Sequence, residues 1–398
     1  MILTAIIVYA IVLSGCWATK AFFSRRPEEG APLTIFAVMA ALYIFCAFKL
    51  LSAGALIILI CFIVLDIYML CSASCRLALK SLFSPAMVLF SLIFIFLIYI
   101  NYGKLLSTWG EFSHWATTVK DLVYFEDFSA NPAALSDFKS YPPAMSLWQY
   151  VFQYINTLLK PSERICEWGL YFSYQLACFS LFVPFMGNLS FKKPLQMSLC
   201  ALALVFSPYV IFIDYPSIYR SIEIDTYLSF VFAYCVLLIL LSETYDGFFT
   251  LCLSGGLFIL VLTKEAGLLF AVFALLLLLI ELLFKRRSDT GSPLGLKALP
   301  EYGKAIACFA GAMLLAWLSW KLILFSRGAG ATFPREVDLA EFVKIVIGQI
   351  TEGYRVEVYH NYIAKFFYYD IIRHLSCSSA IVLFLLIMLS FLLLSHLS

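Results

Sequence analysis

Long runs of apolar residues, separated by short polar or charged segments, fill most of this chain. Many runs are about 18–20 residues long, the length that a helix needs to cross the hydrocarbon core of a bilayer. They lack the strict alternation of apolar and polar residues that is typical of membrane β-strands. The pattern predicts an all-α, polytopic membrane protein with about eleven spanning helices, at 2–19, 33–50, 53–71, 84–101, 166–186, 196–213, 222–241, 248–263, 267–284, 305–325 and 376–395.

The composition agrees with this pattern. Of the 398 residues, 63% are hydrophobic and 13% are charged, and the mean hydropathy is +0.94. A soluble protein of this length cannot remove so much apolar surface from water, so the lipid bilayer is an expected partner. The net charge of +2 gives no indication of nucleic-acid binding. Most of the 12 cysteines stand inside apolar runs, and no Cys-x-x-Cys pair suggests a metal site.

The distribution of Lys and Arg between the short connections predicts the orientation. With the N-terminus outside, the cytoplasmic connections carry twelve positive residues and the short outer connections carry three. Positive residues gather on the cytoplasmic side of membrane proteins, so the long connections 102–165 and 326–375 are expected to face outward. The twelve are Lys20, Arg25, Arg26, Arg76, Lys80, Lys192, Lys193, Lys285, Arg286, Arg287, Lys297 and Lys304, and the three are Lys49, Arg220 and Lys264.

Parts of the two long connections have the pattern of helices that lie on a membrane surface. Residues 340–352 place Phe342, Val346 and Ile350 on one stripe, with the charged residues elsewhere. An apolar stripe of this kind predicts an amphipathic helix at the lipid–water interface. The run 117–125 is a second candidate.

The segment 109–115 differs in chemistry from the apolar runs, because it combines a carboxylate, an imidazole and two indoles. Glu111, His114 and Trp115 share one face if the segment is helical, since they are three and four residues apart. A carboxylate at a membrane surface is partly desolvated and can act as a general base. The alternative is a solvated Glu111, with Trp109 and Trp115 as interfacial anchors.

Residues 139–143 form a second cluster, in which Tyr141 precedes two prolines. Two prolines fix the backbone and can begin a helix, here at Ala144. The cluster is then either a plain helix start or a rigid wall beside a site, with Lys139 available to bind an anion.

Three acidic residues, Asp214, Glu223 and Asp225, stand close together in another outer connection. Such a cluster can bind a divalent cation such as Mg²⁺ or Mn²⁺. The alternative is that Arg220 neutralises the cluster, while Glu223 and Asp225 favour a helix N-terminus.

Lys264 and Glu265 interrupt two apolar runs at the predicted outer face. Charged residues at this depth are costly and often functional, and Lys264 can bind a phosphate as a point charge. The alternative is a charged turn that separates two helices. Further phosphate candidates in the last outer connection are Arg327, Arg335, Arg355 and Arg373.

The order of these motifs resembles that of the GT-C superfamily of membrane glycosyltransferases, which includes protein O-mannosyltransferases and aminoarabinose transferases. The resemblance covers about residues 85–375, with Glu111 at the second position of an acidic pair and Tyr141 before the Pro-Pro motif. The first acidic position is Gly110 in this chain. The resemblance implies a core at 84–398, preceded by additional N-terminal spans at 1–83.

The resemblance also implies an inverting transferase that moves a sugar from a polyprenyl-phosphate donor to a hydroxyl of a glycan, lipid or protein acceptor. Its catalytic residues are expected to be Glu111 and His114, with Glu223 or Asp225 as the base if Glu111 does not act alone. The expected location is a bacterial cytoplasmic membrane, with the site facing outward. Competing interpretations are a transporter or flippase and an inactive scaffold. The expected substrate-binding residues are Trp109, Trp115, Lys139, Tyr141, Arg220 and Lys264.

Overall fold

A computed structural model describes residues 1–211, 218–242, 244–284, 302–329 and 339–368. All regular secondary structure in these ranges is helical, without any strand, so the predicted all-α class is confirmed. The chain divides into two compact units. Unit 1 comprises 1–205 and 218–332, and unit 2 comprises 206–217 and 333–398.

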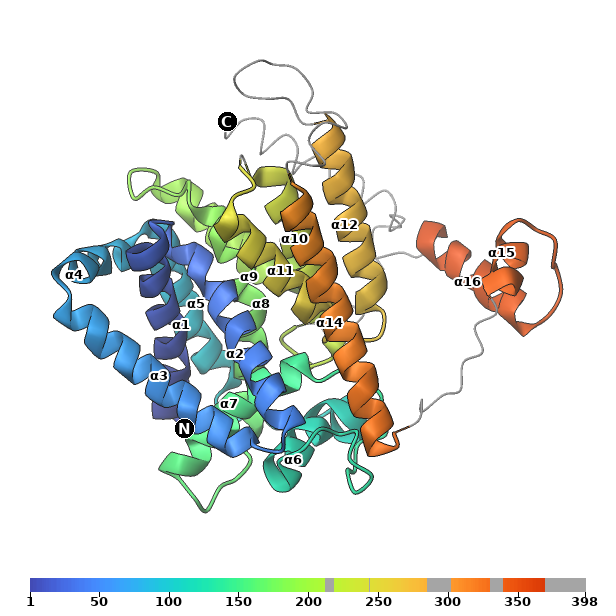
Figure 1. Ribbon diagram of the computed structural model, residues 1–398, viewed down its shortest axis with the longest axis horizontal. Helices are drawn as coiled ribbons and strands as arrows, with labels where there is room; N and C mark the ends of the chain where they lie inside the picture. The colour runs from blue at the N-terminus through green and yellow to red at the C-terminus, as the bar shows by residue number, and fades with distance from the viewer. Residues whose placement is uncertain (212–217, 243, 285–301, 330–338, 369–398) are drawn as a thin grey trace. The chain divides into compact units, whose positions relative to one another are not determined.

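Unit 1 contains most of the described helices (Figure 1). They are α1 (Ile2–Phe23), α2 (Gly30–Ala47), α3 (Leu51–Cys71), α4 (Ala73–Leu79), α5 (Pro85–Asn101), α6 (Ala116–Phe125), α7 (Ala144–Leu159), α8 (Glu167–Ser180), most of α9 (Pro194–Ile211), α10 (Ile224–Leu241), α11 (Gly247–Val261), α12 (Gly267–Phe284) and α14 (Gly303–Arg327). Each predicted span from 2–19 to 305–325 corresponds to a helix, and the last, 376–395, lies outside the described residues.

Five of the described helices are long and apolar enough to cross a membrane: α1, α2 with its preceding turn, α3, α10 and α14. A sixth candidate is the pair α4–α5, which is bent by 68° at the break. In α3 only 17% of the apolar window is buried, and Ile60, Ile63 and Ile67 point outward. Such an apolar outer face fits a helix surrounded by lipid. The described helices thus support a membrane protein, with fewer qualifying spans than the eleven predicted.

The centre of unit 1 brings N-terminal and C-terminal helices together. α11 lies alongside α14 and also packs against α2 and α10 (Figure 1). α1 and α2 both pack against α7, so the first helices share the core with the rest of this unit.

α7 is a core helix inside the connection 102–165, where the sequence predicted only its start. It packs against α1, α2, α6 and α8. Three buried polar side chains of α7 bond to the backbone near the start of α8: those of Gln149, Gln153 and Asn156. Gln153 bonds both the N–H and the carbonyl of Cys166, at 2.7 and 3.1 Å. These bonds satisfy polar groups that would otherwise be costly to bury.

Unit 2 contains α15 (Leu339–Val346) and α16 (Tyr354–Tyr368). The predicted helix at 340–352 is wrong in length, because α15 ends at Val346. Gly348 has φ 75, a left-handed conformation that does not continue a helix. An ion pair between Arg355 and Glu341 joins the two helices.

Candidate functional site

Glu111 begins a single turn of π-helix, Glu111–Trp115, that leads directly into α6. Its side chain is fully buried, at 0% exposure. Oε2 accepts hydrogen bonds from the backbone N–H groups of Ser107, at 2.8 Å, and Thr108, at 2.9 Å. Oε1 accepts one from the N–H of Ile222 at 3.3 Å. These three donors satisfy the buried carboxylate and tie the segment to the chain just before α10.

Glu223 precedes α10, and its carboxylate lies beside Gly110. A Cβ atom built on Gly110 would lie 3.2 Å from Glu223 Oε1. Gly110 has φ −62 and ψ −30, an ordinary helical conformation, so it is space and not backbone strain that suits a glycine here. The carbonyl of Glu223 accepts a hydrogen bond from the Tyr174 hydroxyl at 2.6 Å, and its N–H donates to Ser221 Oγ at 3.2 Å. Glu223 therefore fills the space beside the position that lacks an acidic residue.

Three aromatic rings surround His114. The ring centres of Trp115, Phe138 and Tyr141 lie 4.5, 5.2 and 5.2 Å from that of the imidazole. Phe138 and Tyr141 stack on each other at 5.1 Å. The structure thus brings together two motifs that the sequence presented separately, 111–115 and 138–141.

His114 is buried and keeps a neutral ring. Its exposed fraction is 2%, and its Nδ1 lies 3.5 Å from Thr118 Oγ. Burial lowers the pKa of His114 to about 3, and the nearby Lys264 ammonium acts in the same direction. A neutral imidazole at physiological pH is suited to hydrogen bonding and packing, and is a poor proton donor.

Lys264, between α11 and α12, reaches the same group of residues. Its Nζ lies 2.6 Å from Asp225 Oδ1 and 5.9 Å from the centre of the Tyr141 ring. Asp225 stands in the first turn of α10. Among the described residues, Lys264 and not Arg220 is therefore the cation that neutralises Asp225.

The turn before α7 is fixed on two sides. The carbonyl of Ser140 accepts a hydrogen bond from Trp320 Nε1 at 2.9 Å, and Ser140 Oγ donates to Glu265 Oε1 at 3.1 Å. The N–H of Ala144 donates to the carbonyl of Leu262 at 2.9 Å. The predicted helix start at Ala144 is confirmed, and Tyr141 is held on a rigid support.

Several predicted binding residues are exposed, are already engaged, or lie outside the described residues. Trp109 is 73% exposed, and Lys139 Nζ donates to the carbonyl of Pro132 at 2.7 Å. Arg327 and Arg355 pair with Asp127 and Glu341. Arg220 is exposed and has no hydrogen-bond or ion-pair partner in the described part of the chain. Two further candidates and one predicted metal ligand lie outside the described residues: Arg335, Arg373 and Asp214.

Lys104 is a site residue that the sequence analysis missed. Its ammonium donates to the carbonyl of Tyr219 and lies 3.6 Å from the centre of the Tyr171 ring. Burial lowers the pKa of Lys104 to about 8, with Glu111 opposing the shift and Arg220 adding to it. The available signal was a lysine three residues beyond the apolar run that ends at Asn101.

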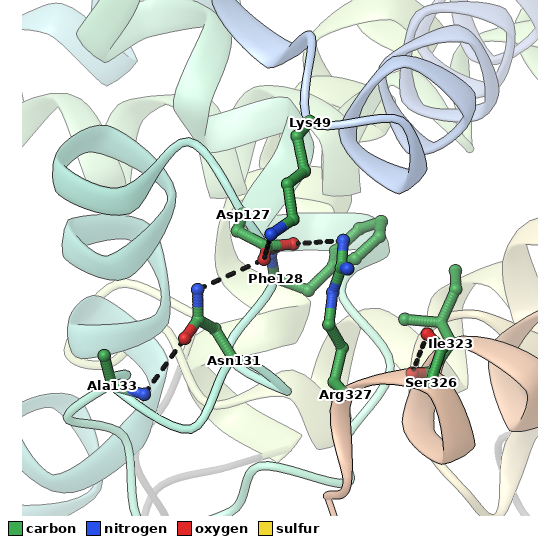
Figure 2. A network of polar contacts seen from close by, with 8 residues as sticks. All are labelled: Lys49, Asp127, Phe128, Asn131, Ala133, Ile323, Ser326 and Arg327. Carbon is green, nitrogen blue, oxygen red and sulfur yellow. Dashed lines mark hydrogen bonds and ion pairs between the residues drawn. The ribbon is translucent and has the colours of Figure 1, made fainter.

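Asp127 connects the segment between α6 and α7 to two other parts of unit 1 (Figure 2). Its side chain is 1% exposed, and Oδ1 accepts a hydrogen bond from Arg327 Nη2 at 3.0 Å. Oδ2 accepts another from Asn131 Nδ2 at 3.1 Å and lies 3.8 Å from Lys49 Nζ. Arg327 belongs to the last turn of α14, and Lys49 to the turn between α2 and α3. A carboxylate buried this deeply requires such partners.

Asp121 fixes the same connection from within α6. Its carboxylate accepts hydrogen bonds from the N–H groups of Leu135, at 3.0 Å, and Ser136, at 3.3 Å. Burial raises the pKa of Asp121, and these bonds oppose the shift. The segment between α6 and α7 is thus anchored by two buried carboxylates.

The arrangement offers carboxylates for proton transfer, ammonium groups for an anion, and ring faces for a flat apolar surface such as that of a sugar. Within the described residues, no group of three or more His, Cys, Asp or Glu side chains could hold a metal ion. Comparisons with protein-family models, with curated proteins and with solved structures give no match.

Proposed function

We propose that the protein is a glycosyltransferase that moves a sugar from a polyprenyl-phosphate donor to an acceptor hydroxyl, with inversion. The observation that supports this most is the meeting of three separate segments, 107–115, 138–141 and 222–225, next to Lys264. They combine the chemical groups that glycosyl transfer from a phosphate requires. The resemblance to the GT-C superfamily supplies the donor class.

The proposed reaction needs one proton acceptor and one anion site. A carboxylate accepts the proton of the acceptor hydroxyl while the hydroxyl oxygen forms a bond to the anomeric carbon. The bond from that carbon to the phosphate oxygen breaks, and its electron pair leaves with the phosphate. Cations such as Lys264 and Lys104 stabilise the charge of the leaving phosphate. Trp115 and Tyr141 offer ring faces to the sugar.

The proposed setting is the outer face of a bacterial cytoplasmic membrane. It rests on the predicted eleven-span topology and on the excess of Lys and Arg in the connections opposite 102–165. The polyprenyl chain of the donor then lies in the bilayer, with its phosphate at the outer ends of the helices.

A divalent cation is not required in this proposal. The carboxylate of Asp225 pairs with Lys264 at 2.6 Å, and among the described residues no group of three or more His, Cys, Asp or Glu side chains could hold a metal ion. We therefore expect transfer to continue in EDTA. A loss of transfer that Mg²⁺ or Mn²⁺ restores would point to a cation held by Glu223 together with Asp214.

Reconstitution in liposomes separates the proposal from its alternatives. The purified protein is supplied with a panel of fluorescent polyprenyl-phosphate sugars and with candidate acceptors. A transferase cleaves the donor and releases polyprenyl phosphate, whereas a flippase moves intact donor between leaflets. A scaffold neither cleaves nor moves the donor. If the donor remains intact with every acceptor tested, the proposal is contradicted.

A further inference from the structure

We infer that Glu223 is the group that accepts the acceptor's proton, and that Glu111 is a positioning residue that holds the segment 107–115 against the chain before α10. The inference rests on the proposed transfer reaction and assigns its base. The assignment is based on a comparison of the carboxylates near Lys264, which differ in their hydrogen-bond and ion-pair partners.

Glu111 is occupied on both oxygens. Its side chain is fully buried, and Ser107, Thr108 and Ile222 donate three backbone hydrogen bonds to it. Proton transfer to Glu111 would place a hydroxyl hydrogen against one of these N–H donors. Its contacts therefore suit a fixed anchor better than a group that takes up and releases protons.

Glu223 has the opposite surroundings. Its carboxylate is half-buried and has no hydrogen-bond or ion-pair partner in the described part of the chain. Gly110 lies beside Oε1, where an added Cβ atom would come within 3.2 Å, so any side chain at position 110 would crowd this carboxylate. The backbone of Glu223 is nevertheless fixed by Tyr174 and Ser221, which gives the carboxylate a defined position.

The electrostatic surroundings of Glu223 also suit a base. Burial raises its pKa, and the neighbouring Asp225 and Glu111 carboxylates raise it further, while Lys264 opposes the shift. A base works best when its pKa is near the working pH. Asp225, a further nearby carboxylate, is 64% exposed and pairs with Lys264, whereas Glu223 is half-buried and unpaired in the described part of the chain.

A relocation of the carboxylate tests this assignment. Glu223→Gln keeps the side-chain size and should reduce turnover of the donor roughly 100-fold or more, with unchanged binding of polyprenyl phosphate. Glu223→Ala with Gly110→Asp places a carboxylate on the other side of the same space. The donor turnover of this double variant should be at least tenfold higher than that of Glu223→Ala. The acidic limb of its pH–rate profile should be shifted.

The controls separate chemistry from folding. Glu223→Ala with Gly110→Asn has the same shape without the charge and should show no recovery. Glu126→Gln changes an exposed carboxylate of the connection 102–165 and should leave turnover unchanged. If Glu223→Gln keeps half or more of the parent turnover at an unchanged melting temperature, the assignment of Glu223 is overturned.

Carbodiimide labelling with a glycine ester gives a readout that needs no substrate. At mildly acidic pH, mass spectrometry should find Glu223 modified well before Glu111, because Glu223 is only half-buried whereas the side chain of Glu111 is fully buried. Labelling of Glu111 at an equal or higher rate overturns the inference. If Glu223 is labelled as expected but no donor is consumed, the proposed transfer reaction is wrong. The inference that Glu223 is the more reactive carboxylate then remains valid.

Discussion

Lys264 Nζ lies 2.6 Å from Asp225 Oδ1, so the charged turn between α11 and α12 is joined to the first turn of α10. The side chain of Asp225 is 64% exposed and that of Lys264 is 23% exposed. Water therefore screens the pair, which stabilises the fold by less than about 1 kcal/mol. A phosphate that reaches Lys264 has to compete only with this weak partner.

Lys264→Ala should therefore weaken donor binding more than it weakens the fold. We expect roughly a tenfold loss of affinity for polyprenyl phosphate, because one charge-assisted contact to the phosphate is removed. The melting temperature should change little. Lys160→Ala, which removes another exposed ion pair, is the matched control. Unchanged affinity in Lys264→Ala would make Lys264 a structural turn residue.

Asp127→Asn should destabilise unit 1 strongly. It removes the charge that Arg327 and Lys49 share and leaves the Arg327 guanidinium largely buried without a counter-charge. The expected loss is about 3 kcal/mol in the free energy of unfolding. Lys49→Ala should cost below about 1 kcal/mol, because its ammonium is 3.8 Å from Asp127 and its side chain is 61% exposed. Chemical denaturation in detergent measures the free energy of unfolding of both variants. Equal losses would contradict the conclusion that Arg327, and not Lys49, is the main partner of Asp127.

Stability should fall as the pH drops below about 6.5, the ordinary pKa of a histidine in an unfolded chain. The buried ring of His114 has a pKa of about 3, so the folded state binds fewer protons than the unfolded state between these values. Stability contributed by His114 is thus fully present above the unfolded pKa and is lost progressively towards pH 3. Melting curves at about pH 7.5 and about pH 5 should differ less in His114→Gln than in the parent. An equal difference would show that His114 titrates normally.

Two thiols test the orientation of unit 1. Ala133→Cys places a thiol at an exposed position between α6 and α7, in the connection expected outside. Cys71 is exposed at the C-terminal end of α3, which is expected on the cytoplasmic side. An impermeant maleimide should label the introduced thiol of the Ala133→Cys variant in intact cells, and Cys71 only after permeabilisation. The reverse result would place the candidate site in the cytoplasm.

Local patterns in the sequence were sufficient for the helices and for parts of the site. Apolar runs predicted helices such as α3, and the two prolines predicted the start of α7. Helical spacing predicted that Glu111, His114 and Trp115 share one face if their segment is helical, and the structure has this segment as one π-helical turn. Each of these predictions depends on residues that are close together in the chain.

Contacts between distant segments could not be predicted in the same way. Gly110 and Glu223 are far apart in the sequence, and neither residue indicates that the other stands beside it. The two prolines predict where α7 begins, but not that α7 is a core helix with buried polar residues such as Gln149 and Gln153. Their partners are backbone groups near the start of α8, which periodicity alone does not reveal.

A structure of the protein with bound polyprenyl phosphate tests the central claim most directly. We predict that the phosphate lies within about 4 Å of Nζ of Lys264 or Lys104, on the side that faces Glu223 and Tyr141. The polyprenyl chain should run along the apolar outer surface of unit 1. A phosphate bound away from both lysines would contradict the claim that this group of residues is the site of glycosyl transfer.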